Sequence, residues 1–498
     1  ESTVELSSYY FANVLGLKDH LSRQQLPKLG LRFFFRSEKQ LREQPLHEQI
    51  EFGARVFPHS PSYQLDRGIF ENFLAEQAQQ LGVHFVDGTK VTDIAIGKED
   101  EGHRVHTLHL ASEARNTYQC RYLVDACSRK SPVKRKLELA QDSQHKVSSA
   151  WFRIADKLDI SEFSDNPQWR AMHEGDNSRW FSTNHLMGEG YWVWLIPLSS
   201  GSTSIGIVAD NNYHPLESYN SIDKAMAWLE QHEPVAARHI RGQLDKLQDF
   251  RVLRNFSHDC KQVYSKDRWF LTGEAGVFLD PFYSPGSDFI AVSNTFVSNL
   301  IQADMAGDKG FATQCMMFNL IYLNMYQNTA LIYQNQYAIF GNPRVMPVKI
   351  LWDFSVYWTF LAFLFIQGTL NDASTFLGLR NYLDEVGNLN RIMQPFLLKW
   401  SELETSPASR TYIDPFEMPL LDSLNAGLYQ ANDAGQFRER FVANLQQLKT
   451  LAAQITSTAC ARHPQLAELR GELPEAGEPG NPIAALLARL DGSEQQAA

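Results

Sequence analysis

Cysteine is scarce in this sequence, and its five cysteines lie far apart. No two of them form a CxxC pair, and none has the spacing to a histidine pair that zinc ligands show. The scarcity argues against a disulfide framework and against a structural zinc site. We therefore expect a protein of the reducing cytoplasm that binds no metal.

Positive charge is also in deficit, with 46 Lys and Arg against 57 Asp and Glu and a net charge of −11. Nucleic-acid binding needs basic surfaces that neutralise phosphates, so we set that function class aside. Long apolar runs are missing as well. The longest, Phe354 to Ile366, is shorter than the roughly 20 residues that span a bilayer. We expect a core helix there, and membrane contact, though possible, is not expected.

Aromatic residues, by contrast, are abundant at 12%. They indicate a large flat-walled cavity or an extended aromatic core. Hydrophobic residues at 44% and charged residues at 21% are ordinary globular values, which exclude a wholly disordered chain. At about 150 residues per domain, the length favours two to four structural units.

Helix and strand patterns alternate in the first part of the chain. Asp66 can cap a helix that Gly82 ends. The spacing of apolar residues predicts a further helix over 9–21, a strand over 29–35, and four short strands over 83–86, 91–96, 105–110 and 118–124. This alternation predicts an α/β layer with an inserted antiparallel ribbon.

A separate β-sheet is predicted next, followed by a helical region. Strands are expected over 148–154, 180–186, 191–197, 203–208 and 269–272, helices over 221–230 and 234–243, and almost only helix beyond Phe289. We expect segment 1–146 to be an α/β domain, 147–260 a sheet domain, 261–300 a return to the first domain, 301–470 a helical region, and 471–498 a linker with a short tail helix.

The segment Gly190-Tyr-Trp-Val-Trp-Leu-Ile-Pro197 carries the most information. Trp192 and Trp194 share one strand face, because alternate side chains of a strand point the same way. Taken alone, such a pair indicates a sheet core. The string WxWxIP, here with Ile196 and Pro197, resembles the signature of the flavin-dependent halogenases. The resemblance implies a wall between the flavin and an organic substrate.

Other segments between residue 1 and about residue 299 resemble the same family. Glu1-Ser-Thr-Val4 is similar to its GES loop, and Asp66-Arg67 to its DRxxF segment. Tyr122 to Arg129 resembles a VDASGR strand end, and Phe270 to Pro281 resembles a VGDAA…DP element before a helix N-terminus. The resemblance implies that FAD is held by Glu1, Ser2, Thr3, Val4, Arg67, Asp125, Ala126, Gly273, Glu274, Asp280 and Pro281.

Lys28, in Leu26-Pro-Lys-Leu-Gly30, is similar in context to the family's catalytic lysine. Alone, a lysine after proline is typically solvated. The resemblance implies a lysine that donates a hydrogen bond to hypohalous acid, or forms a haloamine when its pKa is lowered. The carboxylate that partners this lysine in the indole branch would fall at Tyr283, so the chain looks closer to the phenol and pyrrole branch. His185 and Arg129 are weaker candidates, and a satisfied strand-end histidine is the plainer interpretation of His185.

The sequence departs from the family pattern in three places. The Gly-rich fingerprint for the adenosine pyrophosphate is not found, so we expect about forty residues upstream of Glu1 and weak FAD binding without them. Glu274 stands where an Asp is usual. In the halide loop, Pro285 has no N–H, so a halide would depend on Ser284, Gly286 or Ser287.

The resemblance implies an α/β plus β fold, namely a Rossmann-like FAD-binding domain of the hydroxylase/halogenase type, an antiparallel substrate-domain sheet and a helical C-terminal region. It implies an oxidoreductase that uses reduced FAD, O2 and chloride or bromide to halogenate an electron-rich aromatic compound, as in secondary metabolism. A separate flavin reductase is the expected partner, and the substrate is free or tethered to a carrier protein. The alternatives are a flavin-dependent monooxygenase without halide chemistry and a non-catalytic flavin-binding accessory protein.

Overall fold

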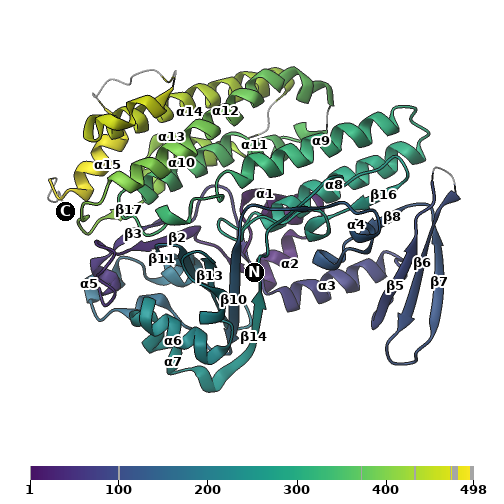
Figure 1. Ribbon diagram of the computed structural model, residues 1–498, viewed down its shortest axis with the longest axis horizontal. Helices are drawn as coiled ribbons and strands as arrows, with labels where there is room; N and C mark the ends of the chain where they lie inside the picture. The colour runs from purple at the N-terminus through teal and green to yellow at the C-terminus, as the bar shows by residue number, and fades with distance from the viewer. Residues whose placement is uncertain are drawn as a thin grey trace. The chain divides into compact units, whose positions relative to one another are not determined.

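The computed structural model describes residues 2–98, 101–371, 373–430, 433–471, 473 and 480–493 (Figure 1). The chain forms two compact units, each made of separate chain segments. Unit 1 comprises Glu1–Leu65, His145–Phe256 and Ala330–Ala498, and unit 2 comprises Asp66–Gln144 and Ser257–Thr329. The predicted domain limits stay a prediction.

Unit 1 is built on an eight-stranded sheet in the order β14-β10-β13-β12-β11-β2-β3-β17. Most neighbours are antiparallel, but β2 runs parallel to β11 and β3 parallel to β17. The strands are β2 (Leu31–Phe35), β3 (Ile50–Phe52), β10 (Val147–Ile154), β11 (Thr183–Gly188), β12 (Tyr191–Pro197), β13 (Thr203–Asp210), β14 (Leu247–Leu253) and β17 (Tyr412–Ile413). The predicted strands in this region are confirmed, although the one expected from residue 180 begins at Thr183.

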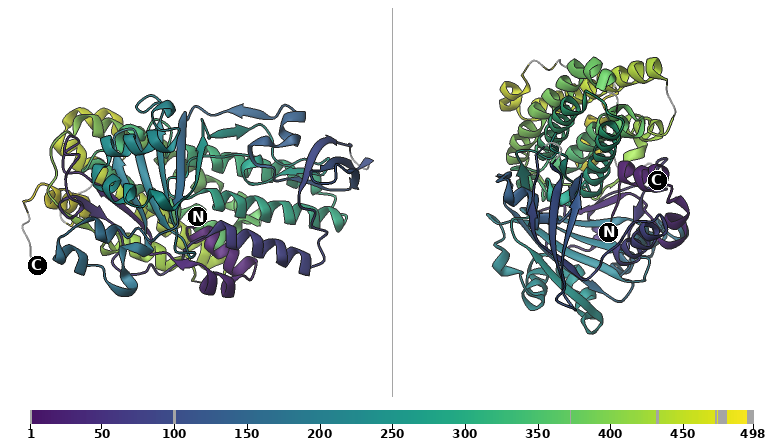
Figure 2. Two further views of the ribbon diagram at one scale, coloured as in Figure 1. Left: turned by 90° about the horizontal axis from the view of Figure 1, so that it is seen from below. Right: turned by 90° about the vertical axis from the view of Figure 1, so that its right-hand side faces the viewer.

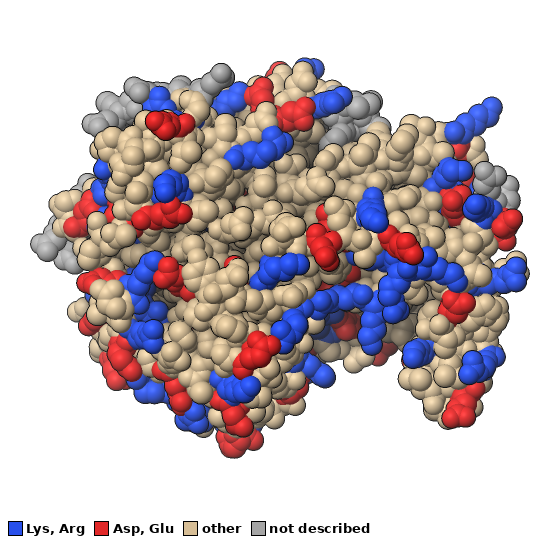
Figure 3. Space-filling model, viewed as in Figure 1, with Lys and Arg blue, Asp and Glu red and all other residues tan. Residues whose placement is uncertain are grey.

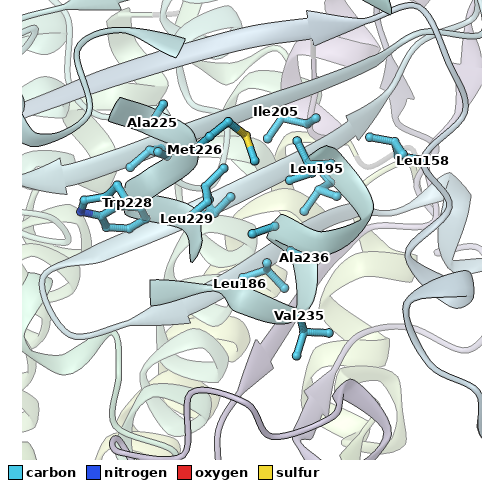
Figure 4. Close-up of a cluster of buried hydrophobic side chains, with 14 of the residues drawn as sticks. Leu158, Leu186, Leu195, Ile205, Ala225, Met226, Trp228, Leu229, Val235 and Ala236 are labelled. Atoms are coloured by element: carbon cyan, nitrogen blue, oxygen red, sulfur yellow. The ribbon is translucent and has the colours of Figure 1, made fainter. Parts of the chain in front are cut away.

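The two faces of this sheet carry different side chains. On one face, alternate residues such as Val193, Leu195 and Ile205 are buried against α6 (Ile222–His232) and α7 (Pro234–Arg241) (Figure 4). The other face carries the tryptophans of β12. The register places Trp194 opposite both His185 of β11 and Gly206 of β13.

The C-terminal segment of unit 1 is helical, as predicted, and its helices lie together over one side of the sheet (Figures 1 and 2). They are α10 (Val345–Thr359), α11 (Leu361–Ile366), α12 (Ala373–Leu403), α13 (Pro419–Gly427), α14 (Ala434–Arg462) and α15 (Pro482–Leu490). One stretch, Val345–Ile366, is long and apolar enough to cross a membrane, but 83% of its most apolar window is buried. It also carries a buried ion pair between Lys349 and Asp353, as suits a core helix.

The N-terminal segment of unit 1 corrects one expectation. In place of one helix over 9–21 there are α1 (Glu5–Tyr9), a π-helical turn (Tyr10–Val14) and α2 (Lys18–Gln24). Gly16 adopts a φ of +70°, a left-handed conformation that ends a right-handed helix. The short strands β1 (Leu26–Pro27) and β4 (Tyr63–Gln64) then pair with each other.

Unit 2 contains three small sheets and four helices among its described residues. The strands are β5 (Thr89–Ala95), β6 (His103–His109) and β7 (Arg115–Cys120) in an antiparallel ribbon, β8 (Leu123–Asp125) parallel to β16 (Trp269–Leu271), and β9 (Ala140–Asp142) with β15 (His258–Cys260). The helices are α3 (Arg67–Gln80), α4 (Pro132–Lys136), α8 (Gly286–Met305) and α9 (Phe311–Ala330). Unit 1 has one further short helix, α5 (Pro167–Ala171). The predicted cap is confirmed, since Asp66 accepts a hydrogen bond from the Gly68 N–H at 3.1 Å.

Two strand predictions in unit 2 were wrong. Residues 83–86 form no strand, because no strand in the described part of the chain pairs with them. Val83 and Phe85 are accordingly half exposed. The single strand expected over 118–124 is divided, its first part belonging to β7 of the ribbon and its last part to β8 of the parallel pair.

The surface carries charges of both signs. Lys and Arg are interspersed with Asp and Glu over the face drawn in Figure 3. Some of the exposed charges form ion pairs, such as Arg238–Glu43 at 2.7 Å.

Candidate active site

A pocket in unit 2 lies between a glycine turn and the start of α8. After β16 the chain turns at Gly273, where φ is +55°, a value that L side chains rarely adopt. The pocket is lined by Gly273, Glu274, Val277, Phe278, Leu279, Asp280, Pro285, Gly286 and Phe289. The structure thus brings together the predicted flavin residues Gly273, Glu274 and Asp280 with Gly286 of the predicted halide loop.

Three predicted cofactor carboxylates hold the loops of unit 2 in place. Asp125 accepts hydrogen bonds from the Cys127 N–H, the Ser131 hydroxyl and the Val133 N–H at 2.7–2.9 Å. Asp280 accepts from the Phe282 N–H at 2.9 Å, and Glu274 accepts from the Ser128 hydroxyl. Their side chains therefore shape the turns around the pocket.

The halide loop offers fewer amides than its length suggests. The Ser284 N–H already donates to the Pro281 carbonyl oxygen at 2.9 Å, and Pro285 has no N–H. Within the described residues, the amides of Gly286 and Ser287 have no protein acceptor. These two amides are at the N-terminus of a 20-residue helix, where the helix dipole favours negative charge.

This donor set fits the phosphate or hydroxyl groups of a dinucleotide, or a halide, because unpaired amides at a helix N-terminus favour an anion. A Cβ at Gly286 would meet only Phe278, at 3.8 Å, so this part of the pocket wall is open. Two other predicted flavin residues in unit 2 are placed differently. Arg67 is exposed and pairs with Glu71 one turn along α3, and Ala126 is exposed in the loop after β8.

Lys28 lies in unit 1 and is almost fully buried, with 1% of its surface exposed. Its Nζ donates to the Ser2 hydroxyl at 2.8 Å and to the Thr3 carbonyl at 2.6 Å. Ser2 also contacts Thr183 of β11 at 3.0 Å. The structure therefore brings Lys28 together with Ser2 and Thr3 and next to Val4, which is buried too, whereas Glu1 lies outside the described residues.

The tryptophans of β12 are fixed by hydrogen bonds. Trp192 Nε1 donates to the Tyr337 hydroxyl at 3.0 Å, and Trp194 Nε1 donates to the Ser204 hydroxyl at 3.1 Å. Their ring centroids are 5.6 Å apart. Ile196 and Pro197 are buried in the same strand. Trp192, Trp194 and Ile196 share one face of it, because alternate side chains point the same way; their role as a wall stays a prediction.

His185 is a buried neighbour of this wall. Its ring lies 5.4 Å from that of Trp192, and its Nδ1 is 2.9 Å from the Arg32 carbonyl. Burial, together with the charge of Lys28, lowers the pKa of His185 to about 3. The histidine is therefore neutral at working pH, as expected of a satisfied strand histidine, yet it stands beside both Trp192 and Lys28.

Sequence reasoning missed a carboxyl group near the lysine. Glu5, the first residue of α1, is buried, and the charge of Lys28 acts on it. Asn425 of α13, 420 residues away in sequence, donates to Glu5 Oε1 at 3.2 Å. The only local sign of this group is one acidic residue between Val4 and Leu6, both apolar.

A model of the FAD-binding domain family matches residues 10–287 of the chain. The chain is 25% identical over 382 residues to the flavin-dependent halogenase chlA of Dictyostelium discoideum, covering 72% of this chain and 62% of that protein. It is 26% identical over 255 residues to the 1H-pyrrole-2-carbonyl-(peptidyl-carrier protein) brominase of Pseudoalteromonas luteoviolacea, covering 50% of this chain and 57% of that protein. The chain thus spans about three-fifths of the length of these relatives.

The fold agrees with a solved halogenase structure. The halogenase PltM in complex with phloroglucinol and FAD matches 98% of this chain and 91% of its own, with a TM-score of 0.63 and 17% identity. The match extends over the helical C-terminal region, which the sequence motifs leave unassigned. The expected fold, an FAD-binding hydroxylase/halogenase fold with mixed sheets and a helical C-terminal region, is confirmed.

Proposed function

We propose that this chain, which belongs to the FAD-binding domain family, halogenates an electron-rich aromatic compound. Flavin-dependent halogenases are among its relatives. The observation that carries the proposal is the buried Lys28, whose ammonium group is held by Ser2 and Thr3. A lysine excluded from water is a strong hydrogen-bond donor to a small oxidant, because no solvent competes for it.

The pocket of unit 2 is the proposed cofactor site, with the glycine turn at Gly273 and the amides of Gly286 and Ser287 as its donors. Bound reduced FAD would supply the activation of O2 and the oxidation of halide to hypohalous acid. A separate reductase would deliver the reduced flavin.

The residues of unit 1 direct the oxidant. Trp192 and Trp194 are locked by hydrogen bonds. We propose that this rigidity lets them keep an organic ring from the flavin while a small oxidant passes. The Lys28 ammonium then donates a hydrogen bond to the oxygen of hypohalous acid, which makes the halogen more electrophilic. The aromatic carbon attacks the halogen as the O–X bond breaks, and the departing hydroxide takes the ring proton to give water, which restores aromaticity.

We propose phenols or pyrroles as substrates. Tyr283 stands where a carboxylate would indicate an indole substrate, and relatives carry names that specify carrier-tethered pyrrole. Carrier-bound substrates are therefore part of the proposal.

The test is Lys28→Ala. We expect loss of all halogenated product, while flavin reoxidation and peroxide release continue, because the variant removes the oxidant's hydrogen-bond donor and leaves the residues of the proposed cofactor pocket unchanged. Product is measured by mass spectrometry and peroxide by a coupled assay. If flavin reoxidation is lost as well, Lys28 supports the fold or the cofactor and not the halogenation.

A flavin-dependent monooxygenase is the second candidate, and Pro285 favours it because one potential halide donor is absent. A panel of phenols and pyrroles, with reduced flavin and with chloride, bromide or neither, separates the two. Halogen isotope patterns only when halide is present support the halogenase. Hydroxylated products in equal yield with and without halide support the monooxygenase.

A further inference from the structure

The Thr3 carbonyl, one of the two acceptors of Lys28, is held in place through its own residue. The Thr3 N–H donates to the Tyr63 carbonyl at 2.9 Å, and the Thr3 hydroxyl accepts from the Tyr63 N–H at 2.8 Å. Lys28 is tied to the same segment, because its backbone N–H donates to the Ser62 carbonyl at 2.9 Å. This acceptor therefore keeps a fixed place relative to the backbone of Lys28.

The second acceptor, the Ser2 hydroxyl, takes its direction from Thr183. An ammonium group has three N–H donors and no acceptor, so Ser2 Oγ accepts the hydrogen bond from Lys28 Nζ, 2.8 Å away. The hydroxyl hydrogen of Ser2 is then left for Thr183 Oγ1, which lies 3.0 Å away. The hydrogen bonds thus run in one direction, from Lys28 through Ser2 to Thr183.

Thr183 is suited to hold this chain of hydrogen bonds, because both its backbone and its side chain are fixed. It is the first residue of β11, and its N–H donates to the carbonyl of Gly30, two residues after Lys28, at 3.1 Å. Its hydroxyl accepts from Gln64 Nε2 at 2.8 Å and donates to Gln64 Oε1 at 3.1 Å. Thr183 and Gln64 are both buried, so water does not compete for these bonds.

We propose that Thr183 is a positioning residue that, through Ser2, sets the orientation of the Lys28 ammonium group. The inference rests on the proposed function for the identity of the oxidant. A single acceptor leaves the flexible lysine side chain able to pivot, whereas two acceptors at fixed places, Ser2 and Thr3, orient the nitrogen. They thereby set the direction of its third N–H, which is the one that meets hypohalous acid in the proposed mechanism.

Thr183→Val tests the proposal, because valine has the shape of threonine without the hydroxyl. Thr183→Ser restores the hydroxyl. Thr203→Val is the matched control, since Thr203 is a buried threonine of β13 whose hydroxyl bonds to the backbone of Asp156 and Leu158. We expect the halogenated product per reduced flavin consumed to fall about five-fold in Thr183→Val, as for the loss of one hydrogen bond, and to stay near the wild-type value in the other two variants.

The product yield is read together with the oxidant that escapes. Hypohalous acid trapped by an added diketone should rise in Thr183→Val as the product falls, while the rate of flavin reoxidation stays unchanged. A merely structural role of Thr183 would not produce this split. An unchanged product yield in Thr183→Val overturns the proposal.

A second measurement follows Lys28 without turnover. In protein labelled with ¹⁵Nζ-lysine, the Lys28 ammonium signal is assigned by Lys28→Arg, and the exchange of its hydrogens with water is measured by NMR. Exchange should be about five-fold faster in Thr183→Val and unchanged in Thr183→Ser and Thr203→Val. Equal exchange in Thr183→Val and the wild type overturns the positioning role.

The two measurements separate this inference from the proposed function. If exchange is faster in Thr183→Val alone but the wild type forms no halogenated product with any substrate, the proposed function fails while the positioning of Lys28 by Thr183 stands. If Thr183→Val does not fold, Thr183→Ala is compared with Thr183→Ser in both measurements.

Discussion

The two units hold their candidate site residues in opposite ways. In unit 1 the candidate groups are buried side chains, such as Lys28 and Trp192, and each is bonded to a side chain or carbonyl from another segment. In unit 2 the available groups are backbone amides of consecutive residues, Gly286 and Ser287, at the start of a helix. A site made of one turn can be identified from a motif, whereas a site assembled from distant segments becomes visible only in the fold.

The charged groups that stabilise unit 1 also come from segments that are distant in sequence. Glu51 of β3 is buried and bonded to Arg32 of β2 and to Arg179, both fully buried. Trp169 Nε1 also donates to Glu51 at 2.9 Å. This cluster joins segments that are far apart in sequence, so the fold around the sheet depends on it.

Glu51→Gln should have the largest effect on stability. Burial alone would raise the pKa of Glu51, but Arg32 and Arg179 outweigh it and lower the pKa to about 2. Relative to the usual value of 4.5, this shift corresponds to about 3 kcal/mol of stability. Because the variant also leaves two buried guanidinium groups without their anion, we expect a loss of about 3–5 kcal/mol in urea unfolding.

The pH dependence of stability shows whether the Glu51 carboxylate stabilises the fold. A lowered carboxyl pKa stabilises the fold fully above the unfolded value near 4.5 and loses that contribution as the pH falls towards 2. Glu51→Gln should therefore flatten the acid limb of the stability curve. The matched control Glu43→Gln breaks an exposed pair with Arg238 and should cost less than about 1 kcal/mol. Equal losses in the two variants would show that the cluster is not structural.

Glycine-to-alanine substitutions test the same difference between the two units, with a smaller expected effect on stability. A Cβ added at Gly206 would lie 2.2 Å from the Trp194 ring, which covers this glycine across the strand pair. We expect Gly206→Ala to displace the ring, cost about 1–3 kcal/mol and change the tryptophan fluorescence. A Cβ at Gly286 would meet only Phe278, at 3.8 Å, so Gly286→Ala should change stability by about 0.5 kcal/mol or less. A larger loss in Gly286→Ala than in Gly206→Ala would reverse the proposed difference between the units.

Sequence patterns predicted the parts of the molecule that depend on local spacing. Strands β2, β10, β11, β12 and β13 of unit 1, the Asp66 cap and the C-terminal helices follow from period and capping, and they are confirmed, whereas β3, β14 and β17 were not predicted. Residues 83–86 have the composition of a strand but form none, since a strand also needs a neighbour that composition does not specify. Glu5 was missed for a related reason, because Asn425 and Lys28 reach it only after the chain has folded.

The halide loop gives the smallest and most specific test of unit 2. With Pro285 lacking an N–H and the Ser284 N–H bonded to Pro281, two amides remain for an anion. A site with few donors disfavours chloride more than bromide, because the smaller ion loses more hydration energy. We therefore expect the wild type to prefer bromide.

Pro285→Ala adds one amide donor beside Gly286 and should raise the use of chloride relative to bromide by at most about five-fold, the ratio reached if one hydrogen bond of about 1 kcal/mol stabilised chloride alone. The measurement is the product ratio, by mass spectrometry, in reactions that contain equal chloride and bromide. Pro132→Ala, at the first turn of α4 in the same unit, controls for loss of a helix-start proline and should leave the ratio unchanged. If Pro285→Ala also leaves it unchanged, the halide does not bind at the start of α8, and the amides of Gly286 and Ser287 serve the cofactor instead.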